Sequence, residues 1–213
     1  MVDPMIKEGL GRLGVEDSER KAGILCSYLD KIMLFNPSLK LVGEKTREEI
    51  ISRHIMDSAA AYGVFLSETH PGDTIADLGS GAGLPGIVLS ILFPDRHFVL
   101  IDRMSRRIGF LRIVKASLSL DNVTILDKDI AEVKERYDYL TCRAFRPLSL
   151  IASDAVKLSE NAILYKGQEK NILQELDNLK KDGYVFSSEI RKLSVPGEEG
   201  ERNIVVLKDW RTQ

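Results

Sequence analysis

Four glycines in eight residues, in the stretch "GSGAGLPG" from Gly79 to Gly86, constrain this chain most strongly. The apolar run before them, residues 74–78, predicts a short strand, and the apolar run after them predicts a helix. Glycine suits such a turn because the backbone must adopt positive φ and let a ligand approach closely. In open α/β sheets the ligand lies at this turn, beyond the carboxyl end of the strand. The stretch therefore predicts an α/β fold with a cofactor loop.

Strand-like and helical segments alternate along most of the rest of the chain, which predicts a parallel, doubly wound sheet with helices on both faces. The expected strands span residues 74–78, 97–102, 123–127, 138–143 and 161–166, and the expected helices span residues 85–93, 104–118, 131–136, 148–158 and 168–181. The runs "GYVFSSEIRKL" and "RNIVVLKDW" have no helix between them and predict an antiparallel hairpin at one edge. Seven strands with the last one antiparallel favour a Rossmann-like methyltransferase sheet over the six parallel strands of dehydrogenases.

The first 70 residues predict a helical extension packed on this sheet. Residues 18–35 have apolar positions at a helical period, with Asp17 or Ser18 as the cap, and Asn36-Pro37 should end the helix. Residues 46–66 predict a second helix that begins with a capping box between Thr46 and Glu49. Its inner face would carry Ile50, Ile51, His54, Ile55, Ser58 and Ala59. We expect two units, the extension at residues 1–70 and the cofactor-binding domain at residues 71–213.

Composition limits the partners and the compartment. The chain has 213 residues and a net charge of −2, so any contact with nucleic acid must come from a local basic patch. Cys26 and Cys142 have no metal-binding spacing and form no disulfide framework, and we expect no metal site. The N-terminus lacks the layout of a signal peptide, and no apolar run approaches the ~20 residues of a membrane helix. We therefore expect a cytoplasmic monomer with no membrane partner.

Two cofactor motifs overlap in the glycine stretch. Residues 81–86 fit the GxGxxG pattern of dinucleotide binders, and residues 79–83 fit the GxGxG pattern of methyl-donor binders. Asp77 lies in the strand two residues before Gly79. A carboxylate there would repel a pyrophosphate but attract the cationic end of S-adenosylmethionine. The second motif is therefore favoured.

The residues around the loop fit the same cofactor. Pro85 suits the first helical position, so the helix should start at Leu84-Pro85, with Gly86 packed closely on the strand. Asp102 ends the second strand, where a carboxylate can bind both ribose hydroxyls of either cofactor. If the glycine-rich turn bound no ligand, the acidic residue at the end of the second strand would have no explanation. The predicted cofactor contacts are Asp77, Gly79, Gly81, Gly83 and Asp102.

Six stretches carry a resemblance to a known family. They read "RHIMDS", "IADLGSGAGLPG", "IDRMSRRIGFLR", "CRAF", "YKGQ" and "GERNIVVLK". In this order they resemble the bacterial small-subunit ribosomal RNA guanine-N7 methyltransferase G family, also called glucose-inhibited division protein B. The resemblance covers residues 35–208. It implies S-adenosylmethionine as the cofactor and a guanine of 16S ribosomal RNA, naked or in the small subunit, as the methyl acceptor.

The resemblance also implies individual site residues. The family's cofactor contacts fall on Gly79 and Leu84 in the loop, on Ile130 and Ala131 after the third strand, and on Arg143 after the fourth. Ile130 and Ala131 would frame the adenine.

The N-terminal segment departs from the family. Phe35-Asn36 stands where the family commonly has Trp-Asn, and Lys40-Leu41-Val42 stands where it has Asn-Leu-Thr. We assign no roles there by analogy. His54 lies at a semi-apolar position, which predicts a structural or substrate-orienting role.

The implied chemistry needs no catalytic base. Guanine N7 has a lone pair and no proton at neutral pH, so positioning in line with the methyl group can suffice. Arg143 is the candidate for positioning, because an uncompensated arginine at the mouth of the sheet would be costly to bury. Cys142 raises a rival interpretation, a cytosine-C5 enzyme with a thiolate nucleophile. A buried structural cysteine is favoured, since no Pro-Cys motif is present.

Basic residues predict an RNA-binding rim at the carboxyl ends of the strands. Residues 103–120 contain no acid, and further basic residues follow the fourth and fifth strands. The RNA-binding candidates are Arg53, Arg103, Arg106, Arg107, Arg146 and Lys166, together with Phe145, which could stack on a base. Arg112 and Lys115 are assigned to a solvated helix face.

Two other functions compete with RNA methylation. A small-molecule methyltransferase of the same fold would use the N-terminal helices as a lid. The other is a nucleotide-linked dehydrogenase or a non-catalytic binding module, of which Asp77 and the C-terminal hairpin disfavour the dehydrogenase.

Overall fold

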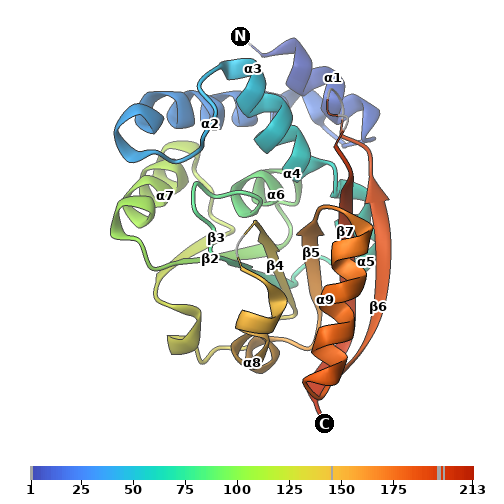
Figure 1. Ribbon diagram of the computed structural model, residues 1–213. Helices are drawn as coiled ribbons and strands as arrows, with labels where there is room; N and C mark the ends of the chain where they lie inside the picture. Colours follow the sequence, from blue (N-terminus) through green and yellow to red (C-terminus); the bar gives the residue numbers. More distant parts are fainter. Residues whose placement is uncertain (1, 145, 196–197, 199) are drawn as a thin grey trace.

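The computed structural model describes residues 2–144, 146–195, 198 and 200–213, and a seven-stranded sheet forms its centre. The strands lie in the order β3-β2-β1-β4-β5-β7-β6 (Figure 1). Their bounds are β1 Thr74–Leu78, β2 His97–Asp102, β3 Val123–Asp127, β4 Tyr139–Arg143, β5 Ala162–Lys166, β6 Tyr184–Leu193 and β7 Arg202–Thr212. Strands β1 to β5 are parallel, whereas β7 pairs antiparallel with both β5 and β6. The predicted Rossmann-like sheet with an antiparallel last strand and an edge hairpin is confirmed.

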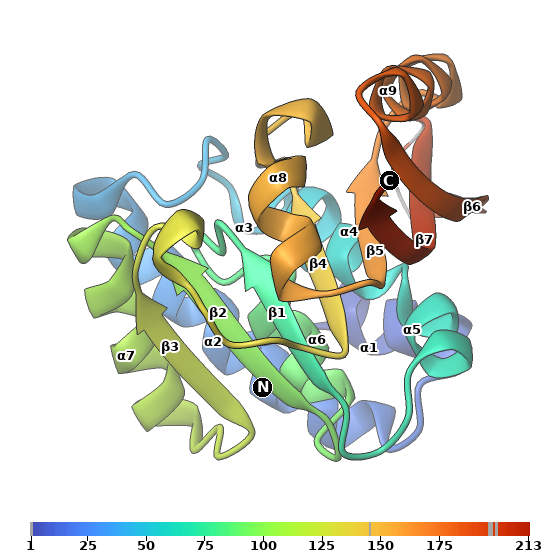
Figure 2. The same cartoon turned by 90° about the horizontal axis from the view of Figure 1, so that it is seen from below.

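Helices cover both faces of the sheet, as Figure 2 shows from below. Helices α8 and α9 lie on one face, and α2, α6 and α7 lie on the other. The helices are α1 Pro4–Arg12, α2 Ser18–Leu39, α3 Arg47–Ile50, α4 Asp57–Ala59, α5 Tyr62–Glu68, α6 Gly86–Leu92, α7 Ser105–Leu118, α8 Leu148–Leu158 and α9 Glu169–Lys181. Within the described ranges, none of them combines the length and apolar character that a membrane span requires.

The sheet divides the core into two hydrophobic clusters. Along β1, Ile75 packs with the N-terminal helices, α6 and α7, while Ala76 and Leu78 pack with α8 and α9. Side chains alternate between the two faces of a strand, and both faces of these parallel strands are covered. This is why the central strands appear as short continuous apolar runs in the sequence.

The N-terminal helices differ from the prediction in two places. Helix α2 does not end at Asn36-Pro37 but continues to Leu39. A proline in the last turn removes a single hydrogen bond and has a helix-compatible φ, and the Lys40 N–H caps the helix by donating to the carbonyl of Asn36. The capping box of Thr46 and Glu49 is confirmed, but the helix after it is not one continuous α-helix.

A π-helical segment, Ile51–Met56, follows α3 directly. A π-helical turn holds more residues than an α-helical turn, and such turns are frequent at functional sites. Ile51 and Ile55 are buried in the core, while Arg53 and His54 line a cavity at the carboxyl ends of the strands. The π-helical segment thus directs its apolar side chains into the core and its polar side chains into the cavity.

Two helix starts also differ from the prediction. Helix α6 begins at Gly86, and Pro85 occupies the N-cap instead of the first helical position. The reason is a tight turn before it, in which the N–H groups of Gly83 and Leu84 both donate to the carbonyl of Ser80. The helix predicted at residues 131–136 is a single 3₁₀ turn, Ile130–Glu132, because the backbone is extended again at Val133.

Gly86 supports a test of the strand–helix packing. A Cβ at this position would lie 2.2 Å from Cδ2 of Leu100 and 2.6 Å from Oδ2 of Asp77, which confirms the predicted close packing. We expect Gly86→Ala to lower the free energy of unfolding by roughly 1–3 kcal/mol in urea titrations, because overpacking strains the core. Gly109→Ala is the matched control, since its helical Cβ meets nothing within 4 Å and should stabilise α7 by about 0.5–1 kcal/mol. Equal effects of the two substitutions would contradict this packing.

Candidate functional site

The glycine loop is tied to the sheet on one side and to the N-terminal helices on the other. The N–H groups of Gly79 and Ser80 donate to the carbonyl of Ile101. On the other side, the Tyr28 hydroxyl on α2 donates to the carbonyl of Ala82 at 2.6 Å. The three loop glycines have positive φ values of 70°, 59° and 94°, which other residues adopt only with strain. These contacts fix the loop beside the carboxyl ends of β1 and β2.

A small cavity of about 160 Å³ lies next to the loop, between the ends of β2 and β3. It contains three of the predicted cofactor residues, Gly79, Asp102 and Ile130. Its other lining residues are Ile101, Arg103, Met104, Arg107, Lys128, Asp129 and Arg146. Ala131, predicted to act with Ile130, is exposed, and its N–H donates to the side chain of Asp129.

Asp102 organises this small cavity. Its Oδ2 accepts a hydrogen bond from the N–H of Gly81 at 2.9 Å, and its Oδ1 accepts one from the N–H of Met104 at 2.9 Å. Arg107 lies 3.5 Å from the same carboxylate, and Arg103 pairs with Asp129. Two of the three arginines predicted for RNA on α7 or just before it therefore line the small cavity instead of an outer rim.

Asp77 is fully buried beneath the loop. Its Oδ2 accepts a hydrogen bond from the N–H of Gly86 at 3.0 Å, whereas its Oδ1 has no hydrogen-bond partner among the described residues. Burial raises the pKa of this carboxyl to about 7, although the Gly86 hydrogen bond and the charge of Arg143 oppose the rise. Such an orphaned buried oxygen is costly and can be satisfied by a cationic ligand.

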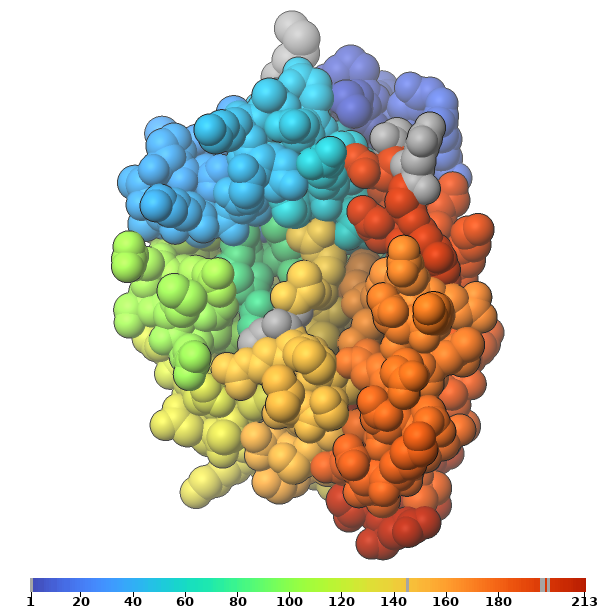
Figure 3. All heavy atoms as spheres, viewed as in Figure 1, coloured from blue at the N-terminus to red at the C-terminus, as the bar shows by residue number. Residues whose placement is uncertain are grey.

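The larger cavity, of about 760 Å³, lies at the ends of β4 and β5, beneath the N-terminal residues. Figure 3 shows a hollow on this face between the N-terminal residues and the residues coloured yellow and orange. The lining residues are Glu44, Arg53, His54, Asp57, Cys142, Arg143, Ala144, Arg146, Pro147, Tyr165, Lys166, Gly167, Leu193, Glu198, Arg202 and Asn203. Most of them come from four of the stretches that carry the family resemblance, "RHIMDS", "CRAF", "YKGQ" and "GERNIVVLK". Folding therefore brings distant motifs to one cavity.

Arg143 lies at the centre of a hydrogen-bonded network in this cavity. Its Nη1 donates to Oδ2 of Asp57 at 2.8 Å and to the carbonyl of Arg53 at 3.0 Å. The Nε of Arg202 donates to the other oxygen of Asp57 at 3.0 Å. The prediction that Arg143 is uncompensated was wrong, because Asp57 comes from a segment 86 residues earlier in the chain.

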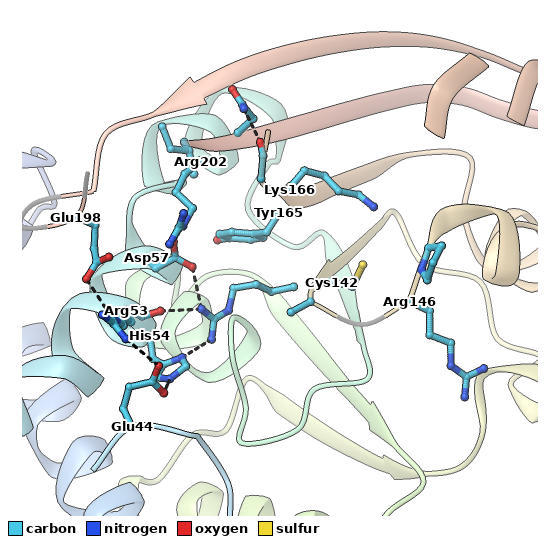
Figure 4. A pocket seen from close by; sticks show the side chains of 16 residues that line it. Glu44, Arg53, His54, Asp57, Cys142, Arg146, Tyr165, Lys166, Glu198 and Arg202 are labelled. Atoms are coloured by element: carbon cyan, nitrogen blue, oxygen red, sulfur yellow. Dashed lines mark hydrogen bonds and ion pairs between the residues drawn. The ribbon is translucent and has the colours of Figure 1, made fainter. Parts of the chain in front are cut away.

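His54 connects this network to Glu44, as the dashed lines of Figure 4 indicate. Its Nδ1 accepts a hydrogen bond from Nη2 of Arg143 at 2.9 Å. Arginine only donates and a carboxylate only accepts, so the neutral tautomer with the proton on Nε2 fits both partners. Burial lowers the pKa of His54, outweighing the opposing effect of Glu44, which favours this neutral form.

The basic residues predicted to bind RNA are mostly paired with acids. Arg53 lies 3.5 Å from Glu198, and Nζ of Lys166 lies 2.6 Å from Glu175. Arg146 lines both cavities, and Arg106 is exposed on α7. The predicted stacking residue Phe145 lies outside the described residues.

Several cavity residues carried no role in the sequence prediction. Asp57 and Arg202 belong to quoted motifs, which was the available signal, whereas Glu44 and Glu198 gave none. Cys142 is buried, and burial raises the pKa of its thiol to about 12. Within the part of the chain that is described, no three His, Cys, Asp or Glu side chains come close enough to hold a metal ion.

These residues fit S-adenosylmethionine. The glycine loop exposes backbone beside a cavity, Asp102 ends β2 at that cavity, and Oδ1 of Asp77 is a buried acceptor without a partner. Gly81, Gly83 and Leu84 line neither of these two cavities. Of the predicted cofactor residues, the fold therefore gathers Gly79, Asp102 and Ile130 directly, while Arg143 lines the larger cavity.

Comparisons with known proteins agree with this fold and show the family. The family model for rRNA small subunit methyltransferase G matches residues 22–205. A ribosomal RNA small subunit methyltransferase G from Brachyspira hyodysenteriae is 35% identical over 198 residues, which cover 91% of this chain and 93% of the relative. A protein of the same name from Cronobacter sakazakii is 35% identical over 205 residues, covering 93% and 94%.

Solved structures support the fold alone. Magnesium protoporphyrin IX methyltransferase from Synechocystis PCC 6803, with bound SAM, has a TM-score of 0.57 at 18% identity over 85% of this chain and 97% of that one. TYW2 from M. jannaschii, in complex with AdoMet, has a TM-score of 0.54 at 15% identity, covering 74% and 77%. The shared feature is the methyltransferase sheet.

Proposed function

This chain belongs to the family of ribosomal RNA small subunit methyltransferases G, and on that premise we propose how its two cavities divide the reaction. The protein is an S-adenosylmethionine-dependent methyltransferase of small-subunit ribosomal RNA, and the family's methyl acceptor is N7 of a guanine in 16S RNA. In our proposal the small cavity holds the adenosine part of the cofactor. Asp102 binds the ribose there, and Ile130 contacts the adenine.

The larger cavity receives the target guanine, and the position of Arg143 is the observation that carries this assignment. Arg143 lines the larger cavity and is also close enough to Asp77 to lower the pKa of that carboxyl. Asp77 is the acid that would face the cationic end of the cofactor. The methyl group would therefore cross beside Arg143, between Asp77 and the larger cavity.

The side chains in this cavity suit a reaction that needs no base. S-adenosylmethionine supplies the methyl group: N7 bonds to the methyl carbon with its lone pair while the carbon–sulfur bond breaks and its electrons stay on sulfur. No proton leaves the base, so the chain's task is to hold the guanine in line. A neutral His54 places no extra positive charge beside a ring that becomes cationic. Asp57 keeps Arg143 and Arg202 in place.

Cys142 separates this reaction from a cytosine-C5 methylation. A thiol with a pKa of about 12 is protonated at neutral pH and is a poor nucleophile. We expect Cys142→Ala to change kcat for RNA methylation by less than about threefold, because only a small buried side chain is lost. Steady-state rates with labelled cofactor measure this, and Cys26→Ala is the buried control. An inactive Cys142→Ala enzyme that still binds cofactor would contradict the N7 mechanism.

Residues 1–70 would act as an extension that completes the site of the methyltransferase domain at residues 71–213. They supply Tyr28 to the loop, and they supply Glu44, Arg53, His54 and Asp57 to the larger cavity. Arg53 and Lys166 would exchange their acidic partners, Glu198 and Glu175, for RNA phosphates, and Arg146, which lines both cavities, would add to this basic surface. We further propose that the protein acts as a monomer in the cytoplasm, where its ribosomal substrate is assembled.

Methyl transfer to defined acceptors tests this function. The protein is incubated with methyl-labelled S-adenosylmethionine and with naked 16S RNA, assembled small subunits or a pool of metabolites. We expect label in 16S RNA in at least one of the first two reactions. Label confined to the metabolites would instead support the small-molecule methyltransferase that this fold also permits.

A further inference from the structure

Glu44 is an acid in the larger cavity for which the methyl transfer itself has no use. It lies in the connection between α2 and α3, which Asn36 holds in place. The Asn36 side chain donates to the carbonyl of Glu44 at 3.0 Å and accepts from the N–H of Val42 at 2.9 Å. The Glu44 carboxylate therefore extends from a fixed backbone and forms part of the wall of the cavity (Figure 4).

The Glu44 carboxylate is oriented and has hydrogen-bonding capacity left. Its Oε2 accepts from Nε2 of His54, while its Oε1 lies 3.8 Å from Nη1 of Arg53, beyond hydrogen-bond distance. Burial raises the pKa of Glu44, but the hydrogen bond from His54 and the nearby charges outweigh it, so the pKa is lowered. The group therefore stays ionised at neutral pH.

The other two acids of the cavity that the structure pairs differ from Glu44 in their contacts. Asp57 uses one oxygen for Arg143 and the other for Arg202, and its side chain is only 8% exposed. Glu198 accepts from the hydroxyl of Ser52 at 3.1 Å and lies 3.5 Å from Nε of Arg53, both through Oε1, and among the described residues no hydrogen bond joins it to His54 or Arg143. The Glu44 side chain is 18% exposed and joined through His54 to Arg143, so it is the acid best placed to meet a base beside the methyl-transfer position.

Guanine differs from the other bases by two adjacent donors, the ring N1–H and the 2-amino group. Two carboxylate oxygens can accept both donors side by side, whereas the unprotonated N1 of adenine would face them as a second acceptor. We propose that Glu44 is the residue that recognises the target base as guanine, by accepting hydrogen bonds from its N1–H and 2-amino group. This inference rests on the proposed function.

The orientation that Glu44 would give the target guanine agrees with this assignment. N7 and the 2-amino group lie on opposite sides of the guanine ring system, so a base held at its Watson–Crick edge by Glu44 directs N7 away from Glu44. The relay from Glu44 through His54 leads to Arg143, whose charge lowers the pKa of Asp77 on the cofactor side. His54 thus fixes the carboxylate at one end and the positioning arginine at the other.

A substrate lacking the 2-amino group tests the proposal. Small subunits are reconstituted with 16S RNA that carries either guanosine or inosine at the methylated position, and kcat/KM is measured for the wild type, Glu44→Gln and Glu198→Gln. We expect the wild type to prefer guanosine by about tenfold or more, which is the discrimination that a good pair of hydrogen bonds to a base edge provides. Glu44→Gln should prefer it by less than about twofold, and Glu198→Gln should keep the wild-type preference.

The dissociation constants of the two RNAs are measured in parallel, so that a variant without turnover still yields a preference. Unchanged affinity for S-adenosylmethionine shows that each variant is folded. A wild-type preference retained by Glu44→Gln, or lost only in Glu198→Gln, would overturn the assignment. If the wild type methylates no guanosine RNA at all, the proposed function itself fails, and this inference fails with it.

Discussion

Arg143→Met is expected to lower kcat for methylation of 16S RNA by about a hundredfold, the scale of a misplaced reacting group. The substitution removes the donors to Asp57 and to His54, and leaves the part-buried Nδ1 of His54 without its partner. The base and the methyl group would then lose their common positioning residue. The affinity for S-adenosylmethionine, measured by calorimetry, should fall less than tenfold.

Two further variants make this result specific to Arg143. Arg143→Lys should not restore the rate, since a lysine lacks the planar fork that reaches Asp57 and His54 together. Arg136→Met removes an exposed arginine that pairs with Glu160, and it should keep full activity. A large loss of cofactor affinity with unchanged kcat would show that Arg143 only binds the cofactor.

Asp77→Asn should weaken binding of S-adenosylmethionine by tenfold to a hundredfold while making the protein without cofactor more stable. The buried Oδ1 has no partner among the described residues, and burial raises the pKa of the carboxyl to about 7. The folded protein without cofactor therefore bears a cost of up to about 4 kcal/mol at neutral pH for ionising this group. Asparagine can still accept from the N–H of Gly86 but offers no charge to a cationic ligand.

The raised pKa of Asp77 also predicts how the free energy of unfolding changes with pH. The pKa of Asp77 is higher in the folded chain than the ordinary 3.8, so the folded state binds the proton more tightly than the unfolded state. This group's contribution to the free energy of unfolding therefore falls as the pH rises from about 4 to about 7. Urea titrations across that range should show this slope in the wild type and in Asp127→Asn, but a smaller slope in Asp77→Asn. An unchanged slope with unchanged cofactor affinity would contradict the role of Asp77.

The strands were predictable because their apolar runs are short and are bounded by polar or turn-forming residues. The strands ending at Leu78, Asp102 and Asp127 begin and end where the sequence indicates. The π-helical segment Ile51–Met56 was not predictable, since its apolar residues fit an ordinary amphipathic helix equally well. The start of α6 was missed because the turn before it depends on hydrogen bonds to Ser80.

The small cavity was more predictable than the larger one. Gly79 and Asp102 are local features of one strand–loop–helix unit and the strand after it. The larger cavity depends on contacts between segments up to 146 residues apart, such as the one from Ser52 to Glu198. Sequence spacing indicated the basic residues but not the acids Glu44, Asp57 and Glu198 that pair with them in three dimensions.

The identity of the methylated nucleoside distinguishes transfer to guanine N7 from methylation of another base. Small subunits or 16S RNA are methylated by the wild-type protein with labelled S-adenosylmethionine, the RNA is digested to nucleosides, and the labelled product is identified by mass and retention time. We expect a single labelled nucleoside, 7-methylguanosine, and its near absence with Arg143→Met. Label in 5-methylcytidine or in a methylated adenosine would contradict transfer to guanine N7.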